Sequence, residues 1–166
     1  IHHHLISKKL RSRASIVCIS GDCIEDHHFA VLIALGASAI YPIGSYTMIQ
    51  RNNPDSDLYS KLDNYRHSIE KGLLKIMSKM GISTLTSYHG SMLLHTIGLG
   101  KTLSEEYFPS IPSIFGGIEI EDIEKSLKKT IKLRDETIQS KDLKEFGLFR
   151  YRKFGEAHGY SPPVFK

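Results

Sequence analysis

The sequence contains no tryptophan and only two cysteines, Cys18 and Cys23. Cys18 lies inside the apolar run at residues 16–19, where a buried strand is expected, and Cys23 follows a turn glycine, Gly21. Nothing in the sequence marks the chain for secretion, and disulfides form mainly in secreted proteins. We therefore expect two inert thiols in a reducing compartment and no disulfide framework.

The sequence also lacks any apolar run near the roughly 18 residues that a transmembrane helix requires, and it carries no signal-peptide pattern. Its formal net charge is only +4, and no aromatic residues alternate with the lysines that carry this excess. Neither a nucleic-acid partner nor a membrane partner is predicted from such a charge pattern. Because the chain begins with Ile1 rather than methionine, we expect a segment of a longer protein.

Motifs of known catalytic sites are missing as well. The chain has no G-x-G-x-x-G dinucleotide fingerprint and no P-loop, and no G-x-S-x-G elbow surrounds Ser87 or Ser91 near His89. Four acidic residues do gather at an expected helix start, where carboxylates stabilise the helix dipole. They are Glu119, Glu121, Asp122 and Glu124. We predict no catalytic residue and no cofactor-binding residue in this chain.

The first recognisable pattern is a strand, a helix and a second strand. Residues 15–20 (SIVCIS) form a β-branched run that predicts a strand buried on both faces. Acidic residues at 22–26 open the predicted helix, and Gly36 stands at its expected C′ position. Residues 37–41 (ASAIY) follow as the second strand, which Pro42 ends. The length of the connection predicts a parallel βαβ unit.

The clearest helical pattern lies between residues 65 and 80. Its apolar positions recur at steps of three and four residues, as one face of a helix requires. They are Tyr65, Ile69, Leu73, Ile76 and Met80, and the lysines expected on a solvated face are Lys71, Lys75 and Lys79. Asp63 is the predicted N-cap and Gly81 the predicted C′ glycine. A strand at residues 82–88 and a short helix at about residues 91–96 are predicted to follow.

Shorter elements are predicted around this helix. A helix is expected at residues 44–50, a polar loop at 51–57, and a helix within 101–112 with Ser104 at its N-cap. Residues 113–118 are expected to form a loop, and residues 119–138 a charged helix whose apolar positions face the body of the protein. Those positions are Ile120, Ile123, Leu127, Ile131 and Leu133. The predicted fold class is α/β: a layered or incomplete-barrel parallel sheet with flanking helices, plus an extended C-terminal arm.

Histidines are the most unusual polar residues of the chain. His2, His3 and His4 are consecutive, and His27 and His28 form a second pair. Adjacent histidines point in different directions on a regular element, whereas a zinc-binding helix uses positions i and i+4, and no Asp, Glu or Cys set completes a site. We favour contacts at a domain interface over a metal site. The same interpretation applies to a C-terminal polar cluster of Arg150, Tyr151, Arg152, Glu156 and His158.

Several ordered stretches resemble glutamate synthase, the large flavoenzyme that makes glutamate from glutamine and 2-oxoglutarate. Residues 70–90 (EKGLLKIMSKMGISTLTSYHG) are similar to the end of the central domain of that family. Residues 2–17 (HHHLISKKLRSRASIV) and 25–42 (EDHHFAVLIALGASAIYP) resemble earlier segments of the same domain. Residues 149–164 (FRYRKFGEAHGYSPPV) are similar to the entrance of the flavin domain. The likeness covers residues 1–120 and resumes at residue 149.

The resemblance implies a division of labour in an oxidoreductase that acts on CH–NH2 groups. An amidotransferase domain with a cysteine nucleophile releases ammonia from glutamine, and a flavin barrel with FMN and a 3Fe-4S cluster reduces iminoglutarate. The central domain lies between them and helps to enclose the ammonia path. This chain is therefore expected to be a scaffold between those two domains, inactive alone. A small NADPH-type subunit or ferredoxin is the implied electron donor, and the cytoplasm or a plastid the implied compartment.

The resemblance also implies boundaries: a central domain at residues 1–118, a helix and linker at 119–146, and an arm into the FMN domain at 147–166. The chain departs from the family pattern in three places. The family prefers Gly-Tyr-Gly where this chain has residues 34–36 (ALG), arginine in place of His89, and a glycine pair at 154–155. Losing that arginine is expected to remove an interdomain hydrogen bond. The alternatives are a stand-alone binding or regulatory protein, or a relic, with the same fold, and a histidine-rich metal-binding protein.

Overall fold

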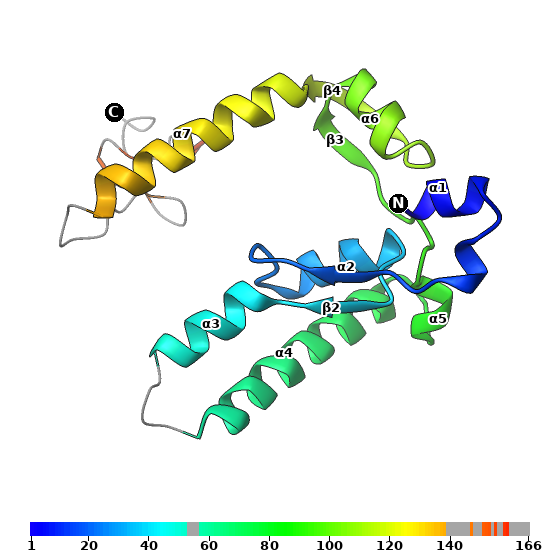
Figure 1. The fold of residues 1–166 in the computed structure, drawn as a ribbon, viewed down its shortest axis with the longest axis horizontal. Helices are drawn as coiled ribbons and strands as arrows, with labels where there is room; N and C mark the ends of the chain where they lie inside the picture. The colour runs from blue at the N-terminus through cyan, green and yellow to red at the C-terminus, as the bar shows by residue number, and fades with distance from the viewer. Residues whose placement is uncertain (53–56, 139–146, 148–150, 154, 156–157, 160–166) are drawn as a thin grey trace.

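The computed structural model describes residues 1–52, 57–138, 147, 151–153, 155, 158 and 159 (Figure 1). The strands are β1 Val17–Ile19, β2 Ala39–Tyr41, β3 Thr96–Leu99 and β4 Ser113–Ile118. The helices are α1 His2–Ser7, the 3-10 turn η1 Arg11–Arg13, α2 Asp26–Ala34, α3 Ile43–Asn52, α4 Leu58–Lys79, α5 Leu85–Tyr88, α6 Lys101–Tyr107 and α7 Ile120–Ile138. The strands make two parallel pairs, β1 with β2 and β3 with β4. The predicted α/β class is confirmed.

β1, α2 and β2 form the parallel βαβ unit that the sequence predicts. Cys18 pairs with Ile40 at the centre of the ladder. Gly36 ends α2 with a φ of +101°, the left-handed conformation in which a C′ glycine carries no Cβ penalty. Its N–H donates to the carbonyl of Ile33, and the N–H of Ala37 donates to that of Leu32, both at 2.9 Å. These are the two hydrogen bonds of a Schellman motif, so the predicted helix stop is confirmed.

The hydrophobic core lies where α2 packs against α4. One buried cluster consists of Ala30, Ile33, Ala34, Met77 and Tyr88. A second cluster consists of Cys23, Phe29 and Ile69, and the half-buried Ile40 and Leu73 pack against both. A side chain at Gly72 of α4 would overlap the carboxylate of Asp26. Glycine at this position therefore allows α4 to approach the N-terminal end of α2 closely.

The opposite face of the β1–β2 sheet is exposed. Val17 is 63% exposed and Ile19 is 67% exposed, while Cys18 between them is half-buried. The prediction that this strand is buried on both faces is wrong, because within the described chain α2 and α4 cover one face only. Parallel sheets are normally covered on both faces. The apolar composition of β1 therefore exceeds what this chain can bury.

β3, α6 and β4 form a second parallel unit, and this region holds two errors of prediction. Residues 113–118 form strand β4 rather than a loop, and the pairing with β3 contains two register shifts. Gly117 packs directly against the carbonyl of Gly98, so glycine at this position permits a close strand approach. Ser104 is not the cap of α6, which begins after Gly100. Instead the Glu119 carboxylate accepts the N–H of Leu103 at 3.1 Å.

The strand predicted at residues 82–88 and the helix predicted at 91–96 are also wrong. Residues 85–88 form the short helix α5, which Thr84 precedes with a 2.8 Å side-chain hydrogen bond to Ser87. Such local hydrogen bonds favour a turn over a strand. Residues 91–95 are irregular. Met92 has a φ of +53°, which a right-handed helix does not allow, and Gly90 and Met92 donate their N–H groups to the carbonyls of Ile33 and Ala34.

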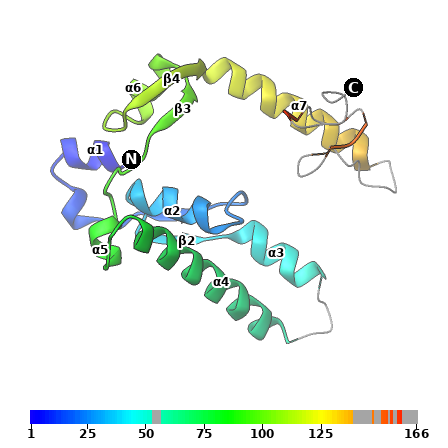
Figure 2. The same cartoon turned by 180° about the vertical axis from the view of Figure 1, so that it is seen from behind.

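Helix α7 is present as predicted, but three of its five predicted apolar positions are exposed, while Ile123 and Leu133 are half-buried. Ile120, Leu127 and Ile131 are 51%, 58% and 50% exposed. Figures 1 and 2 show why: α7 extends away from β4, past the end of the second unit, so its apolar stripe does not reach the β1–β2 unit. The helix is supported locally by ion pairs such as Lys128–Glu124. The prediction that this face packs on the body of the protein is therefore wrong for the described structure.

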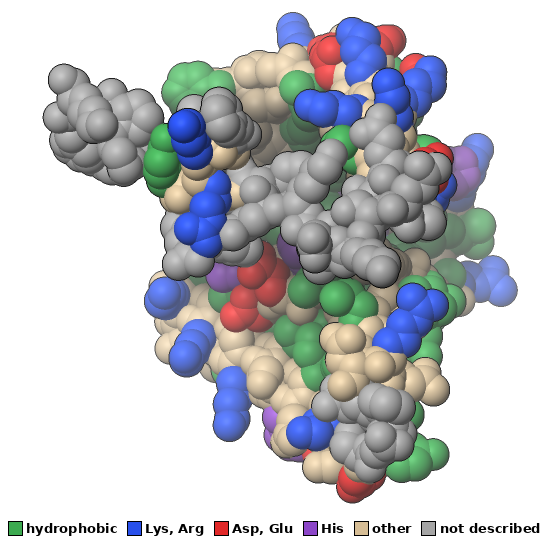
Figure 3. Space-filling view, turned by 90° about the vertical axis from the view of Figure 1, so that its left-hand side faces the viewer, with side chains coloured by type: hydrophobic (Ala, Val, Ile, Leu, Met, Phe, Trp, Pro, Cys, Tyr) green, Lys and Arg blue, Asp and Glu red, His purple; other side chains and the backbone are tan. Residues whose placement is uncertain are grey.

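The basic side chains that the structure describes form no continuous track on the face drawn in Figure 3. On the face drawn in Figure 3, Lys and Arg side chains are scattered over both ends of the molecule, unlike the clustered stripe typical of a nucleic-acid site. The three lysines predicted on the solvated face of α4 are exposed. No helix among the described residues has the length and apolar character needed to cross a membrane.

The N-cap of α4 is Asp57, not Asp63. The helix begins at Leu58, more than one turn before its predicted start. The Asp57 carboxylate accepts the N–H of Ser60 at 3.4 Å. Asp63 lies within the helix and pairs with Arg66, 2.7 Å away. At the other end, Gly81 has a φ of +72° and ends the helix as predicted.

The two aspartates give a matched test of this cap. Asp57→Ala removes the acceptor of an N-terminal N–H group and should cost about 1 kcal/mol of unfolding free energy. Asp63→Ala removes an exposed ion pair and should cost clearly less. Urea unfolding followed by circular dichroism measures both. An equal or larger loss for Asp63→Ala would contradict the assigned helix start.

Candidate interdomain contact site

Three separate segments of the chain meet at the carbonyl of Gly36. Arg11, in η1, donates from Nε to Nδ1 of His2 at 3.0 Å and from Nη2 to the Gly36 carbonyl oxygen at 2.9 Å. His89, which follows α5, donates from Nε2 to the same oxygen at 3.2 Å. We call His2, Arg11, Gly36, His89 and Gly90 the Gly36 corner. It joins α1, the end of α2 and the segment after α5.

The imidazole of His2 lies against two glycine backbones. A Cβ on Gly36 would overlap this ring, and a Cβ on Gly90 would approach its Cε1 to 3.2 Å. Gly90 also has a φ of +67° and donates its N–H to the carbonyl of Ile33 at 2.9 Å. A side chain at either glycine would therefore strain the backbone and also crowd the His2 ring.

The Gly36 corner favours the neutral form of His2. Burial is the largest cause that lowers the pKa of His2 below its ordinary value, and the positive charge of Arg11 lowers this pKa further. The hydrogen bond agrees with this direction, because an Nδ1 atom that accepts from Arg11 carries no proton. The arrangement positions main chain, but it contains no pair of nucleophile and base.

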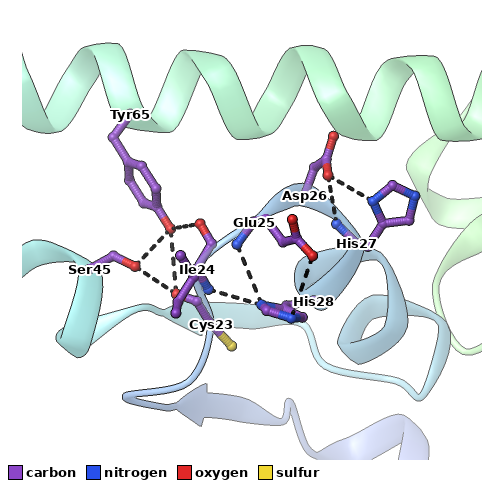
Figure 4. Close-up of polar contacts among 8 residues, drawn as sticks. All are labelled: Cys23, Ile24, Glu25, Asp26, His27, His28, Ser45 and Tyr65. Carbon is purple, nitrogen blue, oxygen red and sulfur yellow. Dashed lines mark hydrogen bonds and ion pairs between the residues drawn. The ribbon is translucent and has the colours of Figure 1, made fainter. Parts of the chain in front are cut away.

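The other histidine pair caps the opposite end of α2 (Figure 4). Nδ1 of His28 accepts the N–H groups of Ile24 at 3.1 Å and Glu25 at 3.5 Å, and Glu25 and His28 complete a capping box. His27 bonds to the Oδ1 atom of Asp26 at 2.9 Å. These contacts satisfy backbone donors that the first turn of a helix leaves free. The positions of the His27 and His28 side chains are therefore explained without a bound ligand.

A partly buried hydroxyl network lies beside this cap and was not predicted. Tyr65 of α4 donates to the carbonyl of Ile24 at 2.9 Å and lies 3.1 Å from Oγ of Ser45, which donates to the carbonyl of Cys23 at 2.8 Å. Figure 4 shows these side chains converging on the loop before α2. Burial raises the pKa of the Tyr65 hydroxyl. The network ties α3 and α4 to the start of α2.

The structure separates the two predicted histidine groups. His3 packs edge-on against His2 with 5.5 Å between ring centroids, and His4 is exposed. His27 and His28 lie at the far end of α2 from the Gly36 corner. Among the residues that the structure describes, no group of three or more His, Cys, Asp or Glu side chains is placed to hold a metal ion.

The predicted C-terminal cluster is described only in part. Arg150 and Glu156 lie outside the described residues. Tyr151 and Arg152 are half-buried, and Nε2 of His158 donates to the carbonyl of Gly147 at 2.5 Å. Sequence reasoning missed Arg11, which makes most of the contacts at the Gly36 corner. The helix-stop glycine Gly36, the interface candidate His2 and the family departure at His89 were the signals in the sequence that marked this place.

Comparison with known proteins identifies the family. A family model described as the glutamate synthase central domain matches residues 1–100. The chain belongs to this family. The ferredoxin-dependent glutamate synthase of Antithamnion sp. is 38% identical over all of the chain, which spans 12% of that relative. The NADPH glutamate synthase large chain of Bacillus subtilis is 36% identical over 98% of the chain, which spans 11% of that relative.

A chloroplastic relative extends the comparison to plants. The ferredoxin-dependent glutamate synthase 2 of Arabidopsis thaliana is 34% identical over the whole chain, which spans 11% of its length. The glutamate synthase central-domain match ends at residue 100, while the similarity to these relatives continues to the end of the chain or close to it. The chain is thus similar to a small segment of larger oxidoreductases. The similar region includes the Gly36 corner and both histidine groups.

Gly36→Ala tests the geometry of the corner. Alanine at this φ should cost at least about 1–2 kcal/mol, and its methyl group should also displace His2. Gly21→Ala is the matched control, because nothing lies within 4 Å of the added carbon and its φ is not positive. Thermal unfolding of both variants measures the difference. Equal stability of the two variants would contradict the described corner.

Proposed function

We propose that this chain is the connecting segment of a glutamate synthase, which converts glutamine, 2-oxoglutarate and reductant into two glutamates. In this proposal the segment is a scaffold between the amidotransferase and FMN domains of the same polypeptide and helps to enclose the ammonia path. It has no catalytic activity alone. The observation that carries the proposal is the family match over residues 1–100, in a chain that spans only about a tenth of its relatives.

The exposed apolar surface supports this role. Val17 and Ile19 on the outer face of β1 and Ile120, Leu127 and Ile131 along α7 are about half to two-thirds exposed. Large exposed apolar surfaces mark contacts with other protein parts, and parallel sheets need cover on both faces. Neighbouring domains of the same polypeptide would supply that cover. We assign residues 1–118 to the central domain, 119–146 to a helix and linker, and 147–166 to the entrance of the FMN domain.

The histidine and C-terminal residues have a place in this proposal. His2 and His3, at the junction of the two sheet units, and the half-buried Tyr151, Arg152 and His158 are proposed to support contacts with neighbouring domains. Arg150 and Glu156 are assigned to the same surface from the sequence alone. His4, His27 and His28 are exposed and are further candidates for such contacts.

The cofactors of the enzyme would bind elsewhere. Iron–sulfur clusters are held by sets of Cys thiolates, and this chain has only Cys18 and Cys23, of which Cys23 is buried. Its residues therefore do not fit the 3Fe-4S cluster. The sequence offers no glycine-rich phosphate loop for FMN. We propose that both groups belong to the FMN domain, that ferredoxin or an NADPH-type subunit supplies electrons, and that the enzyme works in the cytoplasm or a plastid.

A chimera tests the proposal. The matching segment of the Bacillus subtilis large chain, 36% identical, is replaced by this chain, and glutamate formation is measured with glutamine and then with ammonia. We expect glutamine-dependent activity in the chimera and none in the isolated chain. A chimera that folds and binds flavin but forms glutamate from neither nitrogen source would contradict the scaffold role.

The exposed face of β1 provides a sharper variant. Ile19→Lys should leave the stability of the isolated chain nearly unchanged, because the side chain is 67% exposed, but should weaken the chimera by burying a charge at a domain contact. Tyr59→Lys is the control, since Tyr59 is 85% exposed on α4. Similar effects of both substitutions on chimera activity would refute a contact at this face.

A further inference from the structure

Helix α1 lies where the two parallel-sheet units meet. Figures 1 and 2 show α1 and the N-terminus between the α6 end of the second unit and the α2 end of the first. A groove of about 220 Å³ runs through this junction. Ile1, His2 and His3 form one side of it, and Tyr107, Phe108 and Ile111 of the α6 region form another. The position of α1 therefore affects how the two units contact each other.

Arg11 links α1 to the first unit. It donates to the Nδ1 atom of His2 and, through another nitrogen, to the carbonyl of Gly36. A third bond, to the carbonyl of Ala14 at 2.6 Å, fixes the guanidinium itself. Among these three acceptors only the His2 nitrogen can change its protonation state. When Nδ1 carries a proton it becomes a donor that faces the Arg11 donor, and the hydrogen bond cannot form.

The surroundings of His2 are positive. The groups whose charges act on this imidazole are Arg11 of η1, His3 of α1, His89 after α5 and the amino group of Ile1, and each of them disfavours a second positive charge. From α6, Tyr107 borders the same groove. His89 differs from His2 because it donates to the Gly36 carbonyl, and a donor nitrogen keeps its bond in both protonation states.

We propose that the His2–Arg11 contact is a pH-sensitive latch, and that protonation of His2 releases α1 from the Gly36 corner and loosens the junction between the two units. The released state places an imidazolium in water, away from the Arg11 guanidinium. Arg11 keeps its bonds to Gly36 and Ala14, so α2 and β2 stay folded while residues 1–10 detach. The latch acts in the isolated chain and does not depend on the enzyme to which the chain is assigned.

The direction of the pH dependence follows from the lowered pKa of His2. Below the ordinary histidine pKa of 6.5, the folded latch binds fewer protons than the released form. The latch therefore has its full stability above pH 6.5, and this stability is lost as the pH falls through the pKa of His2 in the folded chain. Because one proton is taken up on release, protection of α1 should fall by up to about tenfold per pH unit in that window.

Hydrogen exchange of the full 166-residue chain tests the latch, measured from about pH 8 to about pH 5 and corrected for the intrinsic exchange rate. Residues 1–10 should lose protection at the acidic end, while α2 and α4 should keep theirs. His2→Gln retains an acceptor for Arg11 but does not titrate, so its α1 protection should not depend on pH. His4→Gln changes an exposed histidine of the same helix and should behave as the parent chain.

A measurement on the unsubstituted chain makes the test independent of the variants. Nitrogen NMR of labelled histidine follows Nδ1 of His2 directly, and the expected titration midpoint lies below 6.5. A midpoint at or above that value overturns the proposal even if His2→Gln fails to fold. Loss of α1 protection with the same pH dependence in His2→Gln also overturns it, because another group would then be responsible.

Discussion

The packing of α2 between one face of the β1–β2 sheet and α4 is the contact on which the rest of the structure depends. It buries the cluster around Ile33, Met77 and Tyr88, and Gly72 allows the two helices to approach. The same packing leaves the other sheet face in solvent, with Val17 and Ile19 exposed. A parallel sheet covered on one side only is an incomplete layer, which agrees with a chain that is a small part of its relatives.

The end of α2 determines where the remaining segments attach. Because Gly36 turns the chain with a positive φ, the last carbonyls of α2 point outward, and those of Ile33, Ala34 and Gly36 accept hydrogen bonds from Gly90, Met92 and Arg11. A helix C-terminus normally leaves such carbonyls to water or to caps. Here these carbonyls bind α1, through Arg11, and the segment that leads into the second unit. The C-terminal end of α2 therefore positions both of these segments.

Local patterns predicted the elements whose stabilising contacts are local. The βαβ unit, the Gly36 and Gly81 stops, and helix α7 followed from periodicity and glycine position. Most failures lie where distant partners decide, whereas the strand predicted at residues 82–88 failed because of a local bond between Thr84 and Ser87. Residues 91–95 bond to carbonyls of α2 and Met92 takes a positive φ, β4 needed Gly98 opposite Gly117, and the N–H of Leu103 in α6 bonds to Glu119, 16 residues away. The Gly36 corner escaped prediction for the same reason, because Arg11 and Gly36 are 25 residues apart.

The central claim is that this chain works as a connector inside a glutamate synthase. The most direct measurement is the intact mass and flavin content of the native protein that carries this sequence, purified from its source. The account predicts a polypeptide about eight times longer than this chain, as its relatives are, with bound flavin. A native product of 18.7 kDa without flavin would contradict the connector role and identify a stand-alone protein that retains the central-domain fold.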